Sequence, residues 1–235
     1  MPIIFKCKTT SAFTIKVLAE LLNSNLTTAC FEIDKTGISL TMIDDASTVV
    51  IQLKLHAINF QVYKFKKRNK MYLGITLAHF YKMLKSIKKK DNIELFIDSD
   101  NHTELGIKVK PKDKDRTTTS FIKIQQMQHL CIPLPTDYKR PIIISSSAWY
   151  KIIKDMNQIG NTVHVISNNK SQIIFKCDKD GLIRREEKFG EDNSEDSDTD
   201  DEYDKKEYNE VFKTDQFTKI TKIQGLASDL KIFTS

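Results

Sequence analysis

FYKMLK, at residues 80–85, and WYKIIK, at residues 149–154, share one pattern: an aromatic residue, tyrosine and lysine precede two apolar residues and a second lysine. FTKITK, at residues 217–222, keeps the aromatic residue and both lysines, and FTIKVL, at residues 13–18, is a looser fourth copy. The leading aromatic residues occupy positions 13, 80, 149 and 217, so the copies are almost evenly spaced. This even spacing indicates an internal repeat of four units.

Each copy lies in a stretch with helical periodicity and is followed by short strand-like runs. Apolar residues recur at i, i+3, i+4 and i+7 in residues 11–25 and 77–90, the period of an amphipathic helix. The runs that follow, such as GISLTMID (37–44) and ELGIKVK (104–110), are rich in β-branched residues or alternate in polarity. One helix on half a sheet cannot bury its apolar face, so two units should pair in each domain. We therefore predict an α+β fold of two similar domains, each of two helices on antiparallel sheets.

The domain boundary is predicted from a proline-containing stretch. QQMQHLCIPLPTDYKRP, at residues 125–141, contains three prolines, which favour an extended connection. We expect an N-terminal domain at 1–124, a connector at 125–140 and a C-terminal domain at 141–235. Only positions 218–235 follow the last repeated aromatic residue, which leaves room for one strand, so the last repeat is expected to be incomplete.

The charge of the chain is divided unevenly. Of 37 basic and 31 acidic residues, 3 basic and 13 acidic ones lie in residues 186–210, which leaves 34 basic and 18 acidic residues elsewhere. A folded body this basic is typical of proteins that bind a polyanion. A solvated lysine-rich surface, or the composition of an AT-rich genome, is the alternative. We interpret the acidic stretch at 186–210 as an insertion in the C-terminal domain.

Several classes of function lack support. No apolar run approaches the length of about 20 residues that a membrane-spanning helix needs, so no membrane span is expected. The four cysteines and five histidines are scattered without the spacing of a metal site or a catalytic triad, and no glycine-rich phosphate loop occurs. We expect no enzyme activity, no cofactor and no metal.

Lysines separated by three positions share one face of a helix. Adjacent like charges destabilise an isolated helix, and a phosphate backbone would give them a partner and release condensed counterions. No cluster of Arg, Asn or Gln favours reading of base edges, so binding should not depend on sequence. A solvated helix face is the alternative. The pairs are Lys82 with Lys85, Lys151 with Lys154, and Lys219 with Lys222.

Four longer stretches resemble a known family in the same order along the chain. Residues 29–53 (ACFEIDKTGISLTMIDDASTVVIQL) are similar to its first sheet, and residues 73–95 to its second helix and the following strand. Residues 129–138 (HLCIPLPTDY) resemble its interdomain connector, and residues 145–160 the first helix of its second domain. The family is that of eukaryotic-type DNA sliding clamps, the proliferating cell nuclear antigen (PCNA) family. The chain resembles a divergent member, for which a large DNA virus is one candidate source.

The resemblance implies a function and a set of partners. It implies a homotrimeric ring around double-stranded DNA that tethers a DNA polymerase and other replication and repair proteins, is opened by a clamp loader and catalyses nothing. The expected location is the nucleus, or a cytoplasmic replication site if the chain is viral, with no membrane association. The lysines that match inner-surface positions of the ring are Lys16, Lys82, Lys85, Lys151, Lys154 and Lys222.

The resemblance also implies a groove that binds short peptide motifs of partner proteins. An apolar concavity beside the connector suits anchoring by one aliphatic and two aromatic side chains. Ordinary core positions are the alternative for these residues. The groove residues implied are Ile43, Val50, Leu130, Ile132, Pro133 and Tyr138.

Two other functions compete with the ring. The strands missing after the fourth helix would include an edge that the family uses for subunit contact, which favours a monomeric processivity factor that holds DNA by charge alone. Such a protein would bind with a steep salt dependence and leave DNA without needing an end. A scaffold that uses the groove without DNA is the third hypothesis.

Overall fold

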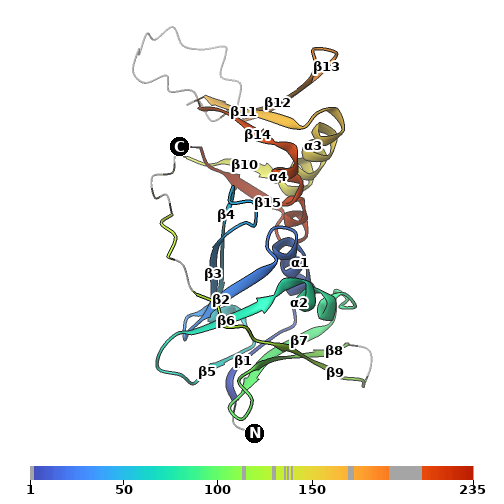
Figure 1. The fold of residues 1–235 in the computed structure, drawn as a ribbon. Helices are drawn as coiled ribbons and strands as arrows, with labels where there is room; N and C mark the ends of the chain where they lie inside the picture. The colour runs from blue at the N-terminus through green and yellow to red at the C-terminus, as the bar shows by residue number, and fades with distance from the viewer. Residues whose placement is uncertain are drawn as a thin grey trace. The chain divides into compact units, whose positions relative to one another are not determined.

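The computed structural model describes residues 3–112, 115–128, 131–134, 136, 138, 140–168, 172–190 and 208–234. The chain forms two compact units, Met1–Pro133 and Leu134–Ser235, whose elements are shown in Figure 1. The division falls inside the predicted connector. Both units carry helices on antiparallel sheets, so the predicted α+β class is confirmed.

Unit 1 contains two antiparallel sheets, with strand orders β5-β1-β7-β8-β9 and β4-β3-β2-β6. Helices α1 and α2 lie side by side. The elements are β1 (Ile3–Thr9), α1 (Ala12–Asn23), β2 (Thr28–Ile33), β3 (Gly37–Ile43), β4 (Val50–His56), the 3-10 helix η1 (Ala57–Asn59), β5 (Val62–Phe65), β6 (Met71–Thr76), α2 (Leu77–Leu84), β7 (Asn92–Asp98), β8 (Glu104–Lys110) and β9 (Thr118–Lys123).

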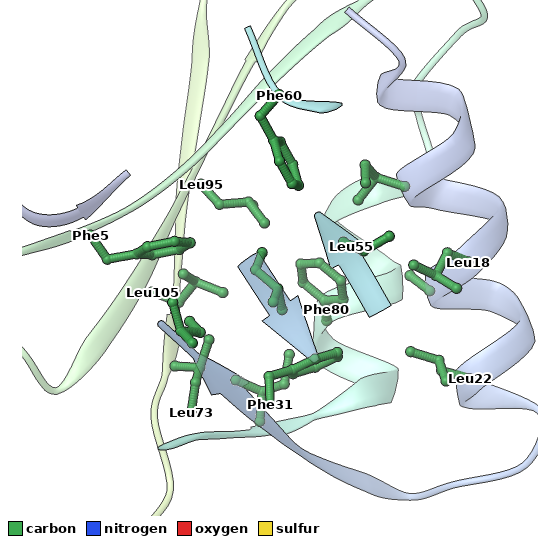
Figure 2. A pocket seen from close by; sticks show the side chains of 15 residues that line it. Phe5, Leu18, Leu22, Phe31, Leu55, Phe60, Leu73, Phe80, Leu95 and Leu105 are labelled. Carbon is green, nitrogen blue, oxygen red and sulfur yellow. The ribbon is translucent and has the colours of Figure 1, made fainter. Parts of the chain in front are cut away.

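The core of unit 1 lies between the helices and both sheets. Leu22 of α1 and Phe80 of α2 are buried against strand residues such as Phe5 and Phe31, as Figure 2 shows. The cavity left among these side chains measures only about 40 Å³ and is lined by apolar residues alone. The apolar residues that recur with helical period in the sequence are therefore those that α1 and α2 bury in this core.

Unit 2 has a four-stranded antiparallel sheet, β13-β12-β11-β14, and a two-stranded sheet, β10-β15. Its buried core includes Trp149 and Met156 of α3 and Phe175 of β12. The elements are β10 (Ile142–Ser145), α3 (Ser146–Ile159), β11 (Thr162–Asn168), β12 (Gln172–Lys179), β13 (Ile183–Phe189), β14 (Tyr208–Lys213), α4 (Thr214–Thr218), the 3-10 helix η2 (Thr221–Gly225) and β15 (Asp229–Ile232).

The fourth repeat differs from the helix expected for it. Helix α4 has only five residues, and a separate 3-10 turn, η2, follows. The hydroxyl of Thr218 donates to the carbonyl of Thr214 (2.9 Å), and the hydroxyl of Thr221 donates to the carbonyl of Thr218 (2.7 Å). Threonine side chains that bond the backbone in this way compete with regular helix formation. The third lysine pair consequently does not lie on one continuous helix.

The acidic stretch at 186–210 is not an insertion over its whole length. Its first four residues belong to β13 and its last three to β14, and both strands are paired in the four-stranded sheet. The strands accommodate charge because alternate side chains of an outer strand face solvent. Gly190 follows β13, and residues 191–207 lie outside the described residues.

Candidate nucleic-acid interface

Helix α2 presents a lysine pair on the face opposite the core. Phe80 and Leu84 are buried, whereas Lys82 and Lys85 are exposed. The helix ends at Leu84, but Lys85 keeps a right-handed helical conformation as its C-cap, so the two lysines retain their spacing of i and i+3. This surface carries two cationic side chains that phosphate groups could contact.

Lys16 of α1 has a different role from the α2 pair. Its ammonium nitrogen donates to the carbonyl oxygens of Lys85 (2.7 Å) and Ile87 (3.2 Å), just beyond the end of α2. Carbonyl groups at a helix C-terminus lack intrahelical partners and carry partial negative charge. The ammonium group also lies 5.7 Å from the centre of the Phe13 ring. Lys16 therefore ties α1 to the end of α2, and its contact with DNA stays a prediction.

The contacts of Lys16 predict that its replacement lowers stability more than replacement of an exposed lysine of α2 does. Lys16→Met keeps the chain length but removes the donor to two carbonyls, so we expect the free energy of unfolding to fall by about 1–2 kcal/mol. The matched change Lys82→Met, on an exposed side chain, should leave stability within about 0.5 kcal/mol. Denaturant titration measures both. Equal stability changes would show that Lys16 has no special structural contact.

Helix α3 presents the equivalent pair in unit 2. Lys151 and Lys154 are exposed, while Trp149, Ile152 and Ile153 are buried on the other face. The N-terminus of the helix is capped, because the hydroxyl oxygen of its N-cap residue, Ser145, accepts a hydrogen bond from the backbone amide of Ala148 (3.2 Å).

The acidic residue of α3, Asp155, does not neutralise the lysine pair of this helix. Asp155 forms an ion pair of 3.1 Å with Arg185 of β13, so its carboxylate is held toward the sheet. The exposed face of α3 therefore remains basic. The third predicted pair is divided: Lys219 is the partly buried C-cap of α4, and Lys222 is exposed on η2.

The predicted peptide groove begins at the β3–β4 hairpin. Ile43 and Val50 are the last paired residues of the two strands and are 43% and 45% exposed. The buried carboxylate of Asp44 accepts hydrogen bonds from the backbone amides of Thr48 (2.7 Å) and Val49 (2.8 Å). Asp44 therefore closes the hairpin loop and keeps two apolar side chains together at the surface.

A second carboxylate anchors this hairpin to the start of β2. Asp45 accepts from the backbone amide (2.9 Å) and the hydroxyl (2.6 Å) of Thr27. The backbone amide of Asp45 donates to the carbonyl of Asn25 (3.1 Å). The loop of the hairpin is thus fixed both internally, by Asp44, and to the start of β2, by Asp45. The sequence analysis did not identify this anchor, although an aspartate before a turn is a known signal.

The remaining groove residues belong to the connector. Ile132 is partly buried and Pro133 is exposed, both in unit 1. Tyr138 lies in unit 2, where its ring packs on Phe233 with centroids 5.3 Å apart. Leu130 lies outside the described residues. Because the groove residues are divided between the units, assembly of the whole groove stays a prediction.

Sites for other chemistry receive no support. Across the described ranges, no group of three or more His, Cys, Asp or Glu residues is placed to hold a metal ion. In the same part of the chain, no helix has the length and apolar character needed to cross a bilayer. Burial raises the pKa of the Cys7 thiol to about 12, so this cysteine is not a reactive thiolate at neutral pH.

Two units of paired helices on antiparallel sheets, with exposed lysines on the helices, define the architecture of a DNA sliding clamp. The family model described as "Proliferating cell nuclear antigen, N-terminal domain" matches residues 4–130. This is more than half of the chain, and the protein belongs to the proliferating cell nuclear antigen family. The family assignment made from the sequence is thereby confirmed.

Comparisons with individual proteins agree with this assignment. "Proliferating cell nuclear antigen 2" of Plasmodium falciparum (isolate 3D7) is 25% identical over 189 residues, which cover 77% of this chain and 70% of that protein. "Uncharacterized protein 436R" of Invertebrate iridescent virus 6 is 27% identical over 161 residues, covering 66% of this chain but only 52% of the viral protein. The crystal structure of the proliferating cellular nuclear antigen from Entamoeba histolytica shares the fold, with a TM-score of 0.83 at 18% identity over 99% of this chain and 90% of that one.

Family membership decides the class of function. Clamps of this family are non-enzymatic scaffolds that act in DNA replication, and this chain is a sliding clamp of that type, a processivity factor and not an enzyme. The family as a whole works with DNA and replication proteins and forms trimers.

Proposed function

We propose that this chain closes as a homotrimer around duplex DNA and tethers a DNA polymerase and other replication and repair proteins to it. The exposed lysine pairs on α2 and α3, one pair in each unit, are the observation that carries this proposal. Ammonium groups contact phosphates without reading bases, so the ring would move along any sequence. The nucleus, or a cytoplasmic replication site of a virus, is the proposed location.

Ring closure requires one contact surface from each unit. Strand β9 is at the edge of its sheet and exposes 54% of Phe121, and β13 is at the edge of its own sheet and exposes 55% of Ile183. Exposed apolar edge strands invite pairing with another chain. We propose that β9 of one copy pairs with β13 of the next. A head-to-tail contact of this kind closes into a ring when its rotation allows.

The solution mass tests the ring directly. We expect light scattering to give three times the chain mass of 27.1 kDa across a concentration series at moderate salt. Phe121→Asp should shift the mass toward one chain, because a carboxylate placed in a paired apolar edge is poorly solvated. Ile58→Asp, on η1 and outside both edge strands, also changes an exposed apolar residue and should leave the trimer intact. A mass of one chain at every concentration would favour the monomeric processivity factor.

Retention on DNA with blocked ends distinguishes a closed ring from a monomeric processivity factor. A closed ring threads onto linear duplex and stays after both ends are blocked with a bulky protein, even when salt is raised. A monomer that holds DNA by charge leaves at high salt whether or not the ends are blocked. Linear duplex with open ends is the matched control.

The β3–β4 hairpin and the connector supply the proposed site for partners. Ile43 and Val50 form an apolar rim held in place by Asp44. A short peptide with one aliphatic and two aromatic anchors would fit such a rim with the connector residues around it. A polymerase and a clamp loader with peptides of this chemistry are the proposed partners.

A further inference from the structure

The five-stranded sheet of unit 1 has one face on the core and an outer face on its other side. Phe5 and Cys7 of β1 and Ile107 of β8 are buried in the core. Successive side chains of a strand point to opposite faces, so the residues between these core positions belong to the outer face. Two rows of the outer face cross all five strands: Lys64, Lys6, Phe96, Gly106 and Phe121 form the first, and Val62, Lys8, Glu94, Lys108 and Thr119 form the second.

The two rows contain four lysines and one glutamate, a net charge of +3. Lys6 lies directly opposite Lys64 of β5, and like charges in this position destabilise a sheet. Glu94 forms an ion pair with Lys6 (2.8 Å). The same carboxylate lies opposite Lys8 on one side and Lys108 on the other. One carboxylate cannot neutralise all of these ammonium groups, so the outer face attracts a polyanion.

The other acidic residues of β7 and β8 on this face lie toward the opposite end of the strands. Asp98 is the last residue of β7, and Glu104, the first of β8, lies opposite Lys123 of β9. At the other end, Lys110 lies opposite the uncharged Asn92. The surplus positive charge is therefore concentrated on the part of the outer face that the two rows and Lys110 cover.

The four-stranded sheet of unit 2 shows that this imbalance is not a general result of a lysine-rich composition. Glu186 of β13 pairs with Lys176 (3.2 Å) and with Lys188 (3.3 Å). Arg184 of the same strand lies opposite Asp178. Three cations thus share two carboxylates in unit 2, whereas four cations share one in the two rows of unit 1.

Two aromatic residues follow the lysines in the first row. The rings of Phe96 and Phe121 meet edge to face, with centroids 6.0 Å apart. Gly106 lies between them, and an added Cβ there would clash with the Cζ atom of Phe96. Phe121 is 54% exposed, so much of its ring is accessible to a ligand beside the lysines.

We propose that the outer face binds a single-stranded nucleic acid, with phosphate groups at the lysines and a base stacked on Phe121. Positively charged surfaces with exposed aromatic rings bind single strands in this way, because every base has a π face. In a duplex these faces are covered by the neighbouring bases, so the outer face prefers single strands. The surface includes neither the lysine pairs of α2 and α3 nor the β3–β4 hairpin, and it adds a second nucleic-acid site to the clamp.

The site is compatible with the proposed ring and does not depend on it. All of its residues belong to unit 1. Pairing of β9 with another strand engages backbone groups at its edge, whereas the side chain of Phe121 projects perpendicular to the sheet. Strand pairing therefore does not by itself occupy the outer face. A clamp with both sites would hold the duplex and the single strand that replication produces.

Two charge-matched variants test where single strands bind. The outer variant carries Lys64→Gln and Lys108→Gln, and the inner variant carries Lys82→Gln and Lys85→Gln, all at exposed positions. The full chain is titrated with labelled oligothymidylate and oligouridylate of about 12 nucleotides and with a duplex, and fluorescence anisotropy gives the affinities. At about 0.15 M salt, the outer variant should bind single strands about tenfold more weakly and bind the duplex within about twofold of the unchanged chain. The inner variant should show the opposite pattern.

Changes at Phe121 test the stacking contact. Phe121→Trp places a fluorescent ring at the stacking position, and oligothymidylate should quench its emission. The unchanged chain, whose one tryptophan is Trp149 of unit 2, should show no such quenching. Phe121→Leu keeps an apolar side chain on β9 but lacks a π face, so its affinity for single strands should fall at least about fivefold. Light scattering checks that Phe121→Leu keeps the mass of the unchanged chain.

Loss of single-strand binding in the outer variant alone would support the proposal, and the ratio of the two affinities would show whether DNA or RNA is preferred. Equal losses in the two lysine variants, or no binding of either strand, would overturn it. Displacement of the strand by polyglutamate as effectively as by unlabelled oligothymidylate would also overturn it, since an acidic protein segment would then be the ligand. A chain that is monomeric but shows the expected pattern would contradict the ring and leave the single-strand site intact.

Discussion

Alanine at Lys82, Lys85, Lys151 and Lys154 together is expected to weaken binding to duplex DNA about a thousandfold at roughly 0.15 M salt. All four side chains are exposed on helices whose other face is buried. Each lysine–phosphate pair contributes about 0.9 to the slope of log K against log salt concentration, so removing four should lower the slope by about 3 to 4. Fluorescence anisotropy with a labelled duplex, repeated at several salt concentrations, measures both quantities.

A matched variant separates the helix faces from overall charge. Lys64, Lys66, Lys108 and Lys110 are also exposed and lie on or beside β5 and β8. Their replacement by alanine removes the same net charge and should change the slope by less than about 1. Equal effects in the two variants would mean that DNA responds to the total charge and not to the helices. Two duplexes of unrelated sequence should give the same result throughout, because no base contact is involved.

Asp44→Ala is expected to lower the free energy of unfolding of unit 1 by about 3 kcal/mol. The carboxylate is 3% exposed and accepts from the backbone amides of Thr48 and Val49 at 2.7 and 2.8 Å. Alanine leaves both amides without this acceptor, and buried unsatisfied donors are costly. Asp44→Asn retains an oxygen at the same place, so its effect should be near about 1 kcal/mol. Denaturant titration of both variants gives the comparison.

Asp44→Ala should also weaken peptide binding at the proposed partner groove. Ile43 and Val50 are held as neighbours by the hairpin that Asp44 closes. We expect Asp44→Ala to weaken binding of a peptide with one aliphatic and two aromatic anchors at least about tenfold under conditions where the protein remains folded. If peptide affinity falls as much in Asp44→Asn, the hairpin closure is not the cause, and the charge itself contributes to binding.

The order of elements can be predicted from the sequence because it depends on local periodicity. Apolar spacing predicts helices at residues 11–25 and 77–90, and α1 and α2 lie within these ranges. The predicted ends are too long, since α2 stops at Leu84 and the chain turns where the amide of Ile87 donates to the carbonyl of Leu84. Residues 88–90 are lysines, which are common in helices, but they lie beyond the end of α2. Composition alone does not show where a helix ends.

The candidate site is predictable in part. The lysine pairs on α2 and α3 are exposed as their spacing indicates, because residues three apart on a helix share a face regardless of tertiary context. The role of Lys16 could not be predicted, because its acceptor, the carbonyl of Lys85, is distant in the chain. The position of Asp45 before a turn is a local signal, but its partner Thr27 could not be predicted, because Thr27 precedes a different element.

By itself, the amino-acid sequence determined the fourfold repeat, the α+β class, the family and the basic helix faces, all of which follow from patterns along the chain. Only the tertiary structure decided that Lys16 bonds carbonyl groups beyond α2 and that Thr218 and Thr221 divide the fourth helix. It also decided that, within the described residues, β15 pairs along one edge with β10. The contact of Lys16 depends on which distant backbone groups lie within hydrogen-bond distance, and the edge of β15 depends on which strands lie beside it. The threonine bonds are local, to carbonyl groups three and four residues away, but they compete with the helix that apolar periodicity predicts, and periodicity does not report side-chain bonding.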